Sequence, residues 1–247
     1  RLLCANAEVR FQPKGVVGVM SPCNFPRQRV VDAVAGAFAA GNSVMLKPSE
    51  FTPQTSALLA QLFDLYFDED EIAVVLGGPE VGAAFAALPF DHLIFTGATS
   101  VGRLVMRAAA DNLTPVTLEL GGKSPVIVGR SADIDKTAAR VMAGKTMNAG
   151  QICLAPDYLM APKEQVKPFV DAATAAVGRM YPTIKDNDDY TAIINQRHLE
   201  RLRGLGLKLR LETFSGEVDA SNALTLVGWK GDYPDADAMA YQALHPA

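Results

Sequence analysis

Cysteine is scarce in this sequence, whose 247 residues include only three: Cys4, Cys23 and Cys153. Three scattered cysteines cannot build a disulfide framework, and they lack the spacing of zinc ligands. We therefore predict no metal site. Thiols that stay reduced are typical of the cytoplasm, which is the compartment that the sequence favours.

An excess of basic residues is also missing, because 23 Lys and Arg stand against 27 Asp and Glu, for a formal charge of −4. No stripe of Lys and Arg is present to neutralise a phosphate backbone. Binding to nucleic acid depends on such a stripe. The sequence therefore predicts no nucleic-acid partner.

Long hydrophobic runs are absent as well. The longest uncharged stretch, 33–46, has 14 residues and contains Gly36, Gly41 and Asn42. A membrane-spanning helix needs about 20 apolar residues, so no span is predicted. No signal peptide is expected at the amino-terminal end, since charged residues follow almost at once. The first residue is Arg1 rather than Met, which suggests a piece of a longer product.

What the sequence does contain is a regular alternation of strand-like and helix-like stretches between residues 15 and 128. Repeated strand–helix–strand units imply a mostly parallel sheet with helices on both faces, and hence the α/β fold class. The expected strands are 15–20, 43–46, 72–76, 93–95 and 116–118, and the expected helices are 26–40, 81–88, 101–110 and one that begins at Thr52-Pro53.

The helix that begins at Thr52-Pro53 has a clear start signal. The hydroxyl of Thr52 is a good N-cap, and Pro53 falls in the first turn, where no backbone donor is needed. Apolar residues then recur at helical spacing, which predicts that one face is apolar. They are Leu58, Leu59, Leu62, Phe63 and Tyr66.

From Pro125 onward the pattern of predicted strands and helices changes. A strand is expected over 126–128, followed by a helix with Asp133 as its N-cap, and Cys153 lies in a Gly-Gln loop just beyond that helix. Residues 205–247 are weakly periodic and carry no assignment. Further expected elements are a strand over 158–161, a helix over 166–180, and a buried stripe formed by Ile134, Ala138, Val141 and Met142.

Two glycine-marked segments carry candidate chemistry: Glu119 precedes Gly121-Gly122, and Cys153 follows Gly150-Gln151. Taken singly, Cys153 is a small buried hydrophobe and Glu119 a surface carboxylate ending a strand. Together they supply a nucleophile and a base for making and hydrolysing a thioester. Because the carboxyl ends of parallel strands are where α/β proteins build sites, we expect Glu119 to be partly buried, with a raised pKa.

Five short segments occur in a characteristic order. They are Ser21-Pro22-Cys23-Asn24-Phe25-Pro26, Lys47-Pro48-Ser49-Glu50, Phe95-Thr96-Gly97-Ala98-Thr99-Ser100-Val101-Gly102, Leu118-Glu119-Leu120-Gly121-Gly122-Lys123 and Gly150-Gln151-Ile152-Cys153. In order and gaps they resemble the aldehyde dehydrogenase superfamily, and most closely its coniferyl-aldehyde-dehydrogenase-like branch. The resemblance covers residues 10 to 204. It implies a Rossmann-like NAD-binding domain over 1–124 without its amino-terminal part, a partial catalytic domain over 125–204, and an unassigned divergent tail over 205–247.

The resemblance implies catalytic roles for three residues. Cys153 is then the nucleophile, and Glu119 is the general base that activates water against the thioester. Asn24, otherwise a turn residue between two prolines, becomes an oxyanion donor together with the backbone N–H of Cys153. Cys23 occupies a position that is usually tryptophan in the family, a change expected to reshape packing near the substrate tunnel.

The resemblance also implies a cofactor site for NAD, with NADP possible. Lys47 contacts the adenosine ribose and Glu50 discriminates between the two cofactors, although Lys-Pro-Ser-Glu alone is an ordinary polar loop. The loop from Gly97 to Gly102 lacks the G-x-G-x-x-G spacing, but its N–H groups can meet a pyrophosphate at a helix start. The expected cofactor-binding residues are Pro22, Lys47, Glu50, Gly97, Ala98, Ser100, Gly102 and Gly121.

The substrate implied by the resemblance is an aldehyde, either a hydroxycinnamaldehyde such as coniferyl aldehyde or a medium-chain aliphatic one. Phe25 is expected to line the tunnel through which the aldehyde enters. Asn148 is a lesser candidate for a site residue. Lys123 is expected to form a structural charge pair. Relatives are usually homodimers or homotetramers. The alternative from another class is a catalytically silent fragment that retains nucleotide binding, because the family's later segments are not recognisable here.

Overall fold

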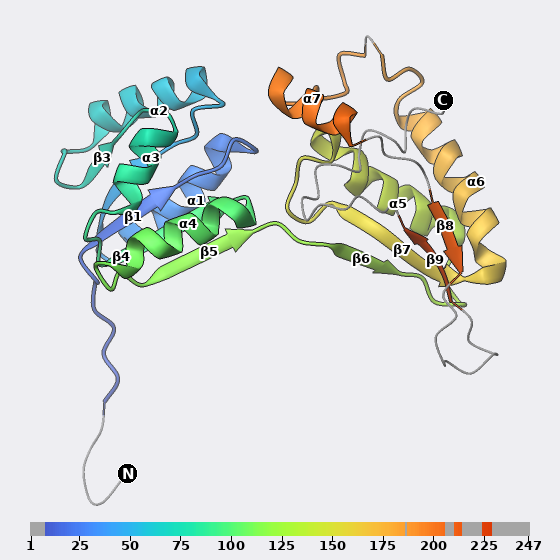
Figure 1. The fold of residues 1–247 in the computed structure, drawn as a ribbon, viewed down its shortest axis with the longest axis horizontal. Helices are drawn as coiled ribbons and strands as arrows, with labels where there is room; N and C mark the ends of the chain where they lie inside the picture. Colours follow the sequence, from blue (N-terminus) through green and yellow to red (C-terminus); the bar gives the residue numbers. More distant parts are fainter. Residues whose placement is uncertain (1–7, 186, 206–209, 214–223, 229–247) are drawn as a thin grey trace, which may run out of the picture. The chain divides into compact units, whose positions relative to one another are not determined.

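A computed structural model describes residues 8–185, 187–205, 210–213 and 224–228 (Figure 1). The chain divides into two compact units, Arg1–Leu120 and Gly121–Ala247. Each unit has its own sheet. They are therefore described one at a time.

The first unit is built on a five-stranded sheet in the order β3-β2-β1-β4-β5, and every neighbouring pair is parallel. This confirms the α/β class expected from the alternating pattern. The observed strands are close to the predicted ones, although β4 and β5 each end two residues later and β3 ends two residues earlier. They are β1 (Val16–Met20), β2 (Ser43–Lys47), β3 (Ile72–Val74), β4 (His92–Gly97) and β5 (Val116–Leu120).

Helices cover both faces of this sheet, as two separate apolar clusters show. One cluster joins α1 (Pro26–Ala39) and α2 (Pro53–Tyr66) to the strands. The other joins α3 (Pro79–Ala86) and α4 (Thr99–Ala110) to the opposite face. Neighbouring residues of β4 illustrate the division, since Ile94 packs against the first cluster while Leu93 and Phe95 belong to the second. Successive side chains of a strand point to opposite faces.

One expectation about α2 is wrong. The hydroxyl of Thr52 does not cap the helix, because Thr52 Oγ1 points back and donates to the Ser49 carbonyl at 3.4 Å. Of the predicted apolar face, Leu59 is buried, whereas Leu58 is 54% exposed and Tyr66 71% exposed. The side that packs on the sheet is Ser56, Leu59 and Phe63.

The second unit has a four-stranded sheet in the order β6-β7-β9-β8. The pair β6–β7 is parallel, whereas β9 runs antiparallel to both of its neighbours. Its strands are β6 (Ser124–Ile127), β7 (Pro156–Pro162), β8 (Arg210–Thr213) and β9 (Leu224–Gly228), and its helices are α5 (Ile134–Thr146), a short 3-10 turn (Met147–Gly150), α6 (Lys163–Met180) and α7 (Gln196–Gly204).

The start of α5 confirms its predicted cap, since the Asp133 carboxylate accepts from the Lys136 N–H at 3.0 Å. Ala138 is fully buried, and Ile134 and Val141 pack against the same cluster. The sequence did not predict α7, β8 or β9. Of the unassigned tail over 205–247, only Leu205, β8 and β9 are described, and the remainder lies outside the described residues.

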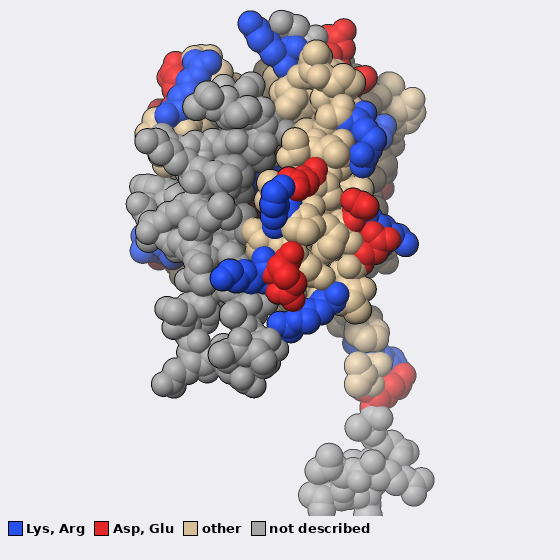
Figure 2. All heavy atoms as spheres, turned by 90° about the vertical axis from the view of Figure 1, so that its right-hand side faces the viewer, with Lys and Arg blue, Asp and Glu red and all other residues tan. Residues whose placement is uncertain are grey.

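Charges of both signs are interspersed over the face of the second unit that Figure 2 presents. Lys167 pairs with Asp171 at 2.6 Å, and Arg130 pairs with Glu164 at 3.3 Å, all four side chains being largely exposed. Exposed pairs of this kind contribute little to stability. Among the described residues, no helix is long and apolar enough to cross a membrane. The same ranges hold no cluster of three or more His, Cys, Asp or Glu side chains that could bind a metal.

Candidate active site

The carboxyl edge of the first sheet gathers most of the predicted site residues. In register, Met20 of β1 lies between Lys47 of β2 and Phe95 of β4, and Thr96 of β4 lies opposite Glu119 of β5. The loops that follow these strands therefore leave from one edge. Strand order reverses between β1 and β4, and such reversal points are where open α/β sheets form ligand crevices. The predicted residues at this edge are Pro22, Asn24, Phe25, Lys47, Glu50, Gly97, Ala98, Ser100 and Glu119, whereas Gly121 begins the second unit.

The loop after β1 places Asn24 directly before α1. The Ser21 N–H donates to the Lys47 carbonyl at 3.1 Å, which ties this loop to the end of β2. Phe25 then adopts a left-handed conformation (φ 49, ψ 49) as the N-cap residue of α1. Left-handed backbone is uncommon outside glycine. This conformation of Phe25 lets the helix start at Pro26, and Asn24 is left half-buried at the sheet edge.

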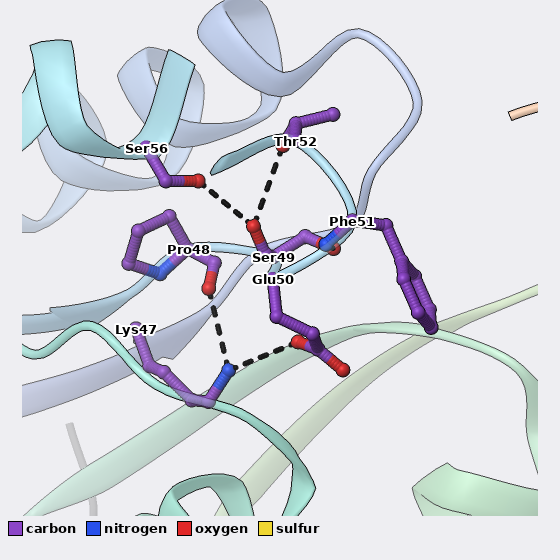
Figure 3. Close-up of polar contacts among 7 residues, drawn as sticks. All are labelled: Lys47, Pro48, Ser49, Glu50, Phe51, Thr52 and Ser56. Carbon is purple, nitrogen blue, oxygen red and sulfur yellow. Dashed lines mark hydrogen bonds and ion pairs between the residues drawn. The ribbon is translucent and has the colours of Figure 1, made fainter. Parts of the chain in front are cut away.

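The side chain of Lys47 is buried beneath α3 and ends at Glu50 (Figure 3). A Cβ added at Gly82 of α3 would come within 3.3 Å of Lys47 Cε, so the helix packs on the lysine stem. The Lys47 ammonium donates to the Pro48 carbonyl at 3.3 Å and pairs with Glu50 Oε2 at 3.2 Å. Lys47 is 5% exposed, whereas the Glu50 side chain is 31% exposed. A cation and a carboxylate therefore stand together at the loop tip.

Hydrogen bonds to Ser49 fix the shape of this loop (Figure 3). The Ser56 hydroxyl donates to the Ser49 carbonyl at 2.8 Å, and the Phe51 N–H donates to Ser49 Oγ at 3.2 Å. Both serines are buried. Sequence reasoning missed Ser56, although a polar residue on the packed side of α2 was an available signal. Its bond holds the loop that carries Glu50 against the start of α2.

The loop between β4 and α4 offers backbone donors. Ala98 is the N-cap residue, and its side chain cannot accept from the first turn of α4. The amide groups of such a turn and the helix dipole favour an anion. Ser100 lies exposed in this turn. The site therefore fits a phosphate of the predicted cofactor, a contact that stays a prediction.

The glycines of this loop have packing roles. A Cβ at Gly97 would lie 2.6 Å from the Phe95 ring, and one at Gly102 would lie 2.8 Å from Leu120 Cδ2. Gly102 thus brings α4 close to β5. At Gly121 a Cβ would meet nothing within 4 Å, so nothing in the structure requires glycine there.

Glu119 lies within β5, and its side chain is exposed. The expectation of partial burial is wrong, because β5 is the edge strand and exposes one of its faces. Along the strand, Thr117 and Glu119 are exposed, whereas Val116, Leu118 and Leu120 pack against the α4 side. This carboxylate therefore stands in contact with solvent at the carboxyl edge.

Cys153 belongs to the second unit, in a turn between the 3-10 segment and β7. It is half-buried and is not in a disulfide. Three residues just before it, Asn148, Ala149 and Gly150, have φ values of 51, 53 and 76. The Asn148 side chain donates to the Gln151 carbonyl at 3.1 Å. The thiol is thus carried by an unusually tight turn.

The charge pair expected for Lys123 is confirmed. Its ammonium lies 3.0 Å from Asp157 Oδ2, and the Asp157 side chain is 1% exposed. Asp157 lies in β7, three residues after Leu154 and close to the Cys153 turn along the chain. Removing Lys123 would leave the charge of the buried Asp157 side chain unpaired, which is costly. Lys123 therefore holds the start of β6 to β7.

The first unit thus assembles the residues predicted for cofactor binding, oxyanion stabilisation and base catalysis at one sheet edge, while Cys153 is carried by the second unit. The convergence of Cys153 with Glu119 stays a prediction. A parallel sheet that reverses its order at β1 and β4, with a helix starting at that edge, is the arrangement of Rossmann-like dinucleotide-binding proteins.

The chain belongs to the aldehyde dehydrogenase family, whose model matches residues 4–212. It is 64% identical over 203 residues to a probable coniferyl aldehyde dehydrogenase from Caulobacter vibrioides, a match that covers 82% of this chain and 42% of that protein. A coniferyl aldehyde dehydrogenase from a Pseudomonas species is 64% identical over 198 residues, covering 80% of this chain and 41% of that protein.

The fold also matches a solved structure, a variant of aldehyde dehydrogenase C from Pseudomonas syringae in complex with NAD+ and octanal. The TM-score is 0.72 at 31% identity, and the match covers 89% of this chain and 47% of the other. The chain spans about two fifths of the length of the curated relatives it matches, 42% and 41% in the two cases above.

Proposed function

We propose that this chain carries the cofactor edge and the nucleophile of an enzyme that oxidises an aldehyde to a carboxylic acid with NAD. The observation that carries the proposal is the placement of Asn24, Lys47, Glu50 and Glu119 at one sheet edge of an aldehyde dehydrogenase family member. Relatives named for coniferyl aldehyde, and a similar structure that holds NAD+ and octanal, support it.

Lys47 and the α4 start are the groups that would hold the cofactor. The Lys47 ammonium is fixed at the loop tip by its buried stem and is oriented by Pro48 and Glu50. It can donate to ribose hydroxyls, while the N–H groups at Ala98 to Ser100 can donate to phosphate. When bound, NAD supplies the acceptor for the hydride that leaves the substrate carbon.

The chain's own residues divide the reaction into two halves. The Cys153 thiolate adds to the aldehyde carbon, and the carbonyl oxygen becomes an alkoxide that the Asn24 amide and the Cys153 N–H stabilise. Loss of hydride from this adduct leaves a thioester on Cys153. Glu119 then takes a proton from water, the hydroxide adds to the thioester carbon, and the acid leaves as the sulfur regains its electron pair. Because Glu119 is exposed, this water can reach its carboxylate.

Glu50 is the proposed determinant of cofactor choice. A carboxylate at this position can accept a hydrogen bond from a ribose 2′-hydroxyl, and it repels a 2′-phosphate. The loop that carries it is tied to α2 through Ser49 and Ser56, so it cannot swing away freely. NAD is therefore the proposed cofactor, with NADP bound more weakly.

The proposed substrates are hydroxycinnamaldehydes such as coniferyl aldehyde, together with medium-chain aliphatic aldehydes. The names of the two relatives support the first class, and the octanal in the similar structure supports the second. We further propose that the protein acts in the cytoplasm, where Cys153 stays reduced, and that it assembles as a homodimer or homotetramer.

A second candidate function is nucleotide binding without turnover. This alternative is supported by the division of the predicted residues between the two units. Lys47, Glu50 and the α4 start lie in the first unit, and Cys153 lies in the second. Cofactor binding therefore does not require the nucleophile. The two candidates differ in whether aldehyde is consumed.

One experiment separates them. The purified chain is mixed with NAD and either coniferyl aldehyde or octanal, and NADH is followed by its absorbance in the first turnover. A burst of NADH proportional to the enzyme concentration supports aldehyde oxidation. NAD binding by calorimetry without any burst supports the second candidate, and absence of both contradicts the cofactor site as well.

A further inference from the structure

The turn that carries Cys153 has backbone strain that needs a compensating interaction. Asn148, Ala149 and Gly150 follow one another with φ values of 51, 53 and 76. Left-handed backbone is unfavourable for residues with a Cβ, and two of the three are not glycine. Such conformations persist only where surrounding contacts impose them. Ala149 and Gly150 are buried, which supplies part of that constraint.

Gln151 supplies the rest through its amide group. Its Nε2 donates to the Asn148 carbonyl at 2.9 Å and to the Ala192 carbonyl at 3.1 Å. Its Oε1 accepts from the Ile194 N–H at 3.0 Å. Asn148 returns a bond to the Gln151 carbonyl at 3.1 Å. One side chain therefore closes the strained turn and joins it to a segment 41 to 43 residues further along the chain.

The segment that receives these bonds is itself anchored at both ends. Before it, the rings of Tyr181 and Tyr190 meet edge to face with centroids 5.0 Å apart. After it, the Asn195 side chain accepts from the His198 N–H at 2.9 Å and caps α7. Gln151 therefore links the turn to the segment that lies between these two contacts.

We propose that Gln151 is the positioning residue for the Cys153 nucleophile: its amide locks the left-handed turn to residues 192–194 and so fixes where the thiol stands. The inference rests on the proposed function of Cys153. Cys153 lies two residues beyond Gln151, and the bonds Ile152 N–H to Gly150 and Ala155 N–H to Ile152, at 2.8 and 3.1 Å, carry the constraint onward. The thiol therefore has little freedom once Gln151 is held.

The three hydrogen bonds of the residue 151 side chain fit the amide group of glutamine. An amide has both donors and an acceptor, and all three bonds use that combination. Glutamate keeps the length and the acceptor for the Ile194 N–H, but its carboxylate cannot donate to the Asn148 or Ala192 carbonyl. Gln151→Glu therefore removes the two donated bonds and keeps the accepted one, while Gln151→Ala removes all three.

The test measures alkylation of Cys153 by iodoacetamide, residue by residue, in the full chain by peptide mass spectrometry. In Gln151→Ala, loss of the lock lets the half-buried thiol open, and the alkylation rate rises about tenfold. Gln151→Glu raises it as well. Cys23, in the other unit, serves as an internal reference and keeps its rate.

Gln165→Ala is the matched control, because Gln165 on α6 also donates its amide to a backbone carbonyl, that of Arg130 at 2.9 Å. It leaves both alkylation rates unchanged. An unchanged Cys153 rate in Gln151→Ala, a parallel rise at Cys23, or wild-type behaviour of Gln151→Glu would each overturn the proposal.

A second measurement connects the lock to the reaction. Gln151→Ala lowers the rate of the NADH burst about tenfold while the aldehyde KM and the NAD affinity stay within about twofold, because only the nucleophile is misplaced. A burst rate equal to the wild type, together with faster alkylation, would show that the lock does not position the thiol. Absence of any wild-type burst would contradict the proposed function itself, and the alkylation result would still judge the lock.

Discussion

The two units reach their functional residues by different physical routes. In the first, five parallel strands end at one edge, so the position of a residue after its strand already places it at the site. In the second, Cys153 follows a left-handed turn that side-chain bonds hold to a distant segment. Strand topology positions the proposed cofactor edge, and long-range hydrogen bonding holds the turn that carries the proposed nucleophile.

The largest effect is expected from Cys153→Ala. Without the thiol no covalent adduct forms, so NADH production is lost for every aldehyde, while the NAD affinity stays within about twofold because the cofactor edge belongs to the other unit. Stopped-flow absorbance and calorimetry measure the two quantities. Cys4→Ala, which removes a thiol with no assigned role, is the matched control and keeps the burst. A Cys153→Ala chain that still forms NADH would contradict the assignment of the nucleophile.

Cofactor selectivity gives the next effect. Glu50→Gln keeps the shape of the loop but removes the charge that pairs with Lys47 at 3.2 Å. We expect the ratio of NADP to NAD affinity to rise about tenfold, which corresponds to about 1.4 kcal/mol. Titration of each cofactor by calorimetry measures it. The exposed Glu69→Gln removes an equal charge elsewhere and leaves the ratio unchanged; an equal change in both variants would mean a general charge effect.

Stability of the second unit offers a smaller effect. Asp133→Ala removes the cap of α5 and lowers the free energy of unfolding by about 1 kcal/mol. Chemical denaturation followed by circular dichroism measures it. Asp135→Ala removes the same charge from the first turn but no cap, so it costs less. If the two variants lose equal stability, the 3.0 Å bond to the Lys136 N–H is not what stabilises the helix start.

The smallest effect concerns pH and the first unit. Burial, with a further contribution from Lys14, lowers the pKa of His92 from its ordinary 6.5. Between the lowered pKa and 6.5 the unfolded chain binds more protons than the folded chain, so stability falls as pH decreases through this window. Above it both states are neutral and the effect vanishes. In His92→Gln, the free energy of unfolding should change less between pH 7 and pH 5 than it does in the wild type. An equal change in both proteins would assign the pH dependence to other groups.

The sequence predicted the strands of the first sheet, and the residues at their carboxyl ends, well because these signals are local. Buried strands with a polar residue at the end, such as Lys47 after β2, place side chains at the sheet edge without knowledge of distant contacts. Pro53 likewise marked the start of α2 correctly. The cap of that helix was wrong, since Thr52 prefers the Ser49 carbonyl, a choice that depends on how the preceding loop folds.

Features that depend on the neighbours of a strand were not predictable. Glu119 is exposed because β5 is an edge strand, and strand order does not appear in the local pattern. The lock by Gln151 joins residues more than 40 positions apart, beyond the reach of motif reasoning. Asn195, by contrast, was a cap signal present in the sequence and overlooked, so α7 was missed.

The central claim is that a thiol from one unit and a carboxylate from the other serve one reaction, and Glu119→Gln tests it most directly. In the proposed mechanism, hydride loss to NAD does not need Glu119, whereas thioester hydrolysis needs it as the base. We predict one fast burst of NADH per site, followed by steady turnover reduced about a hundredfold or more. Steady turnover equal to the wild type would contradict the account.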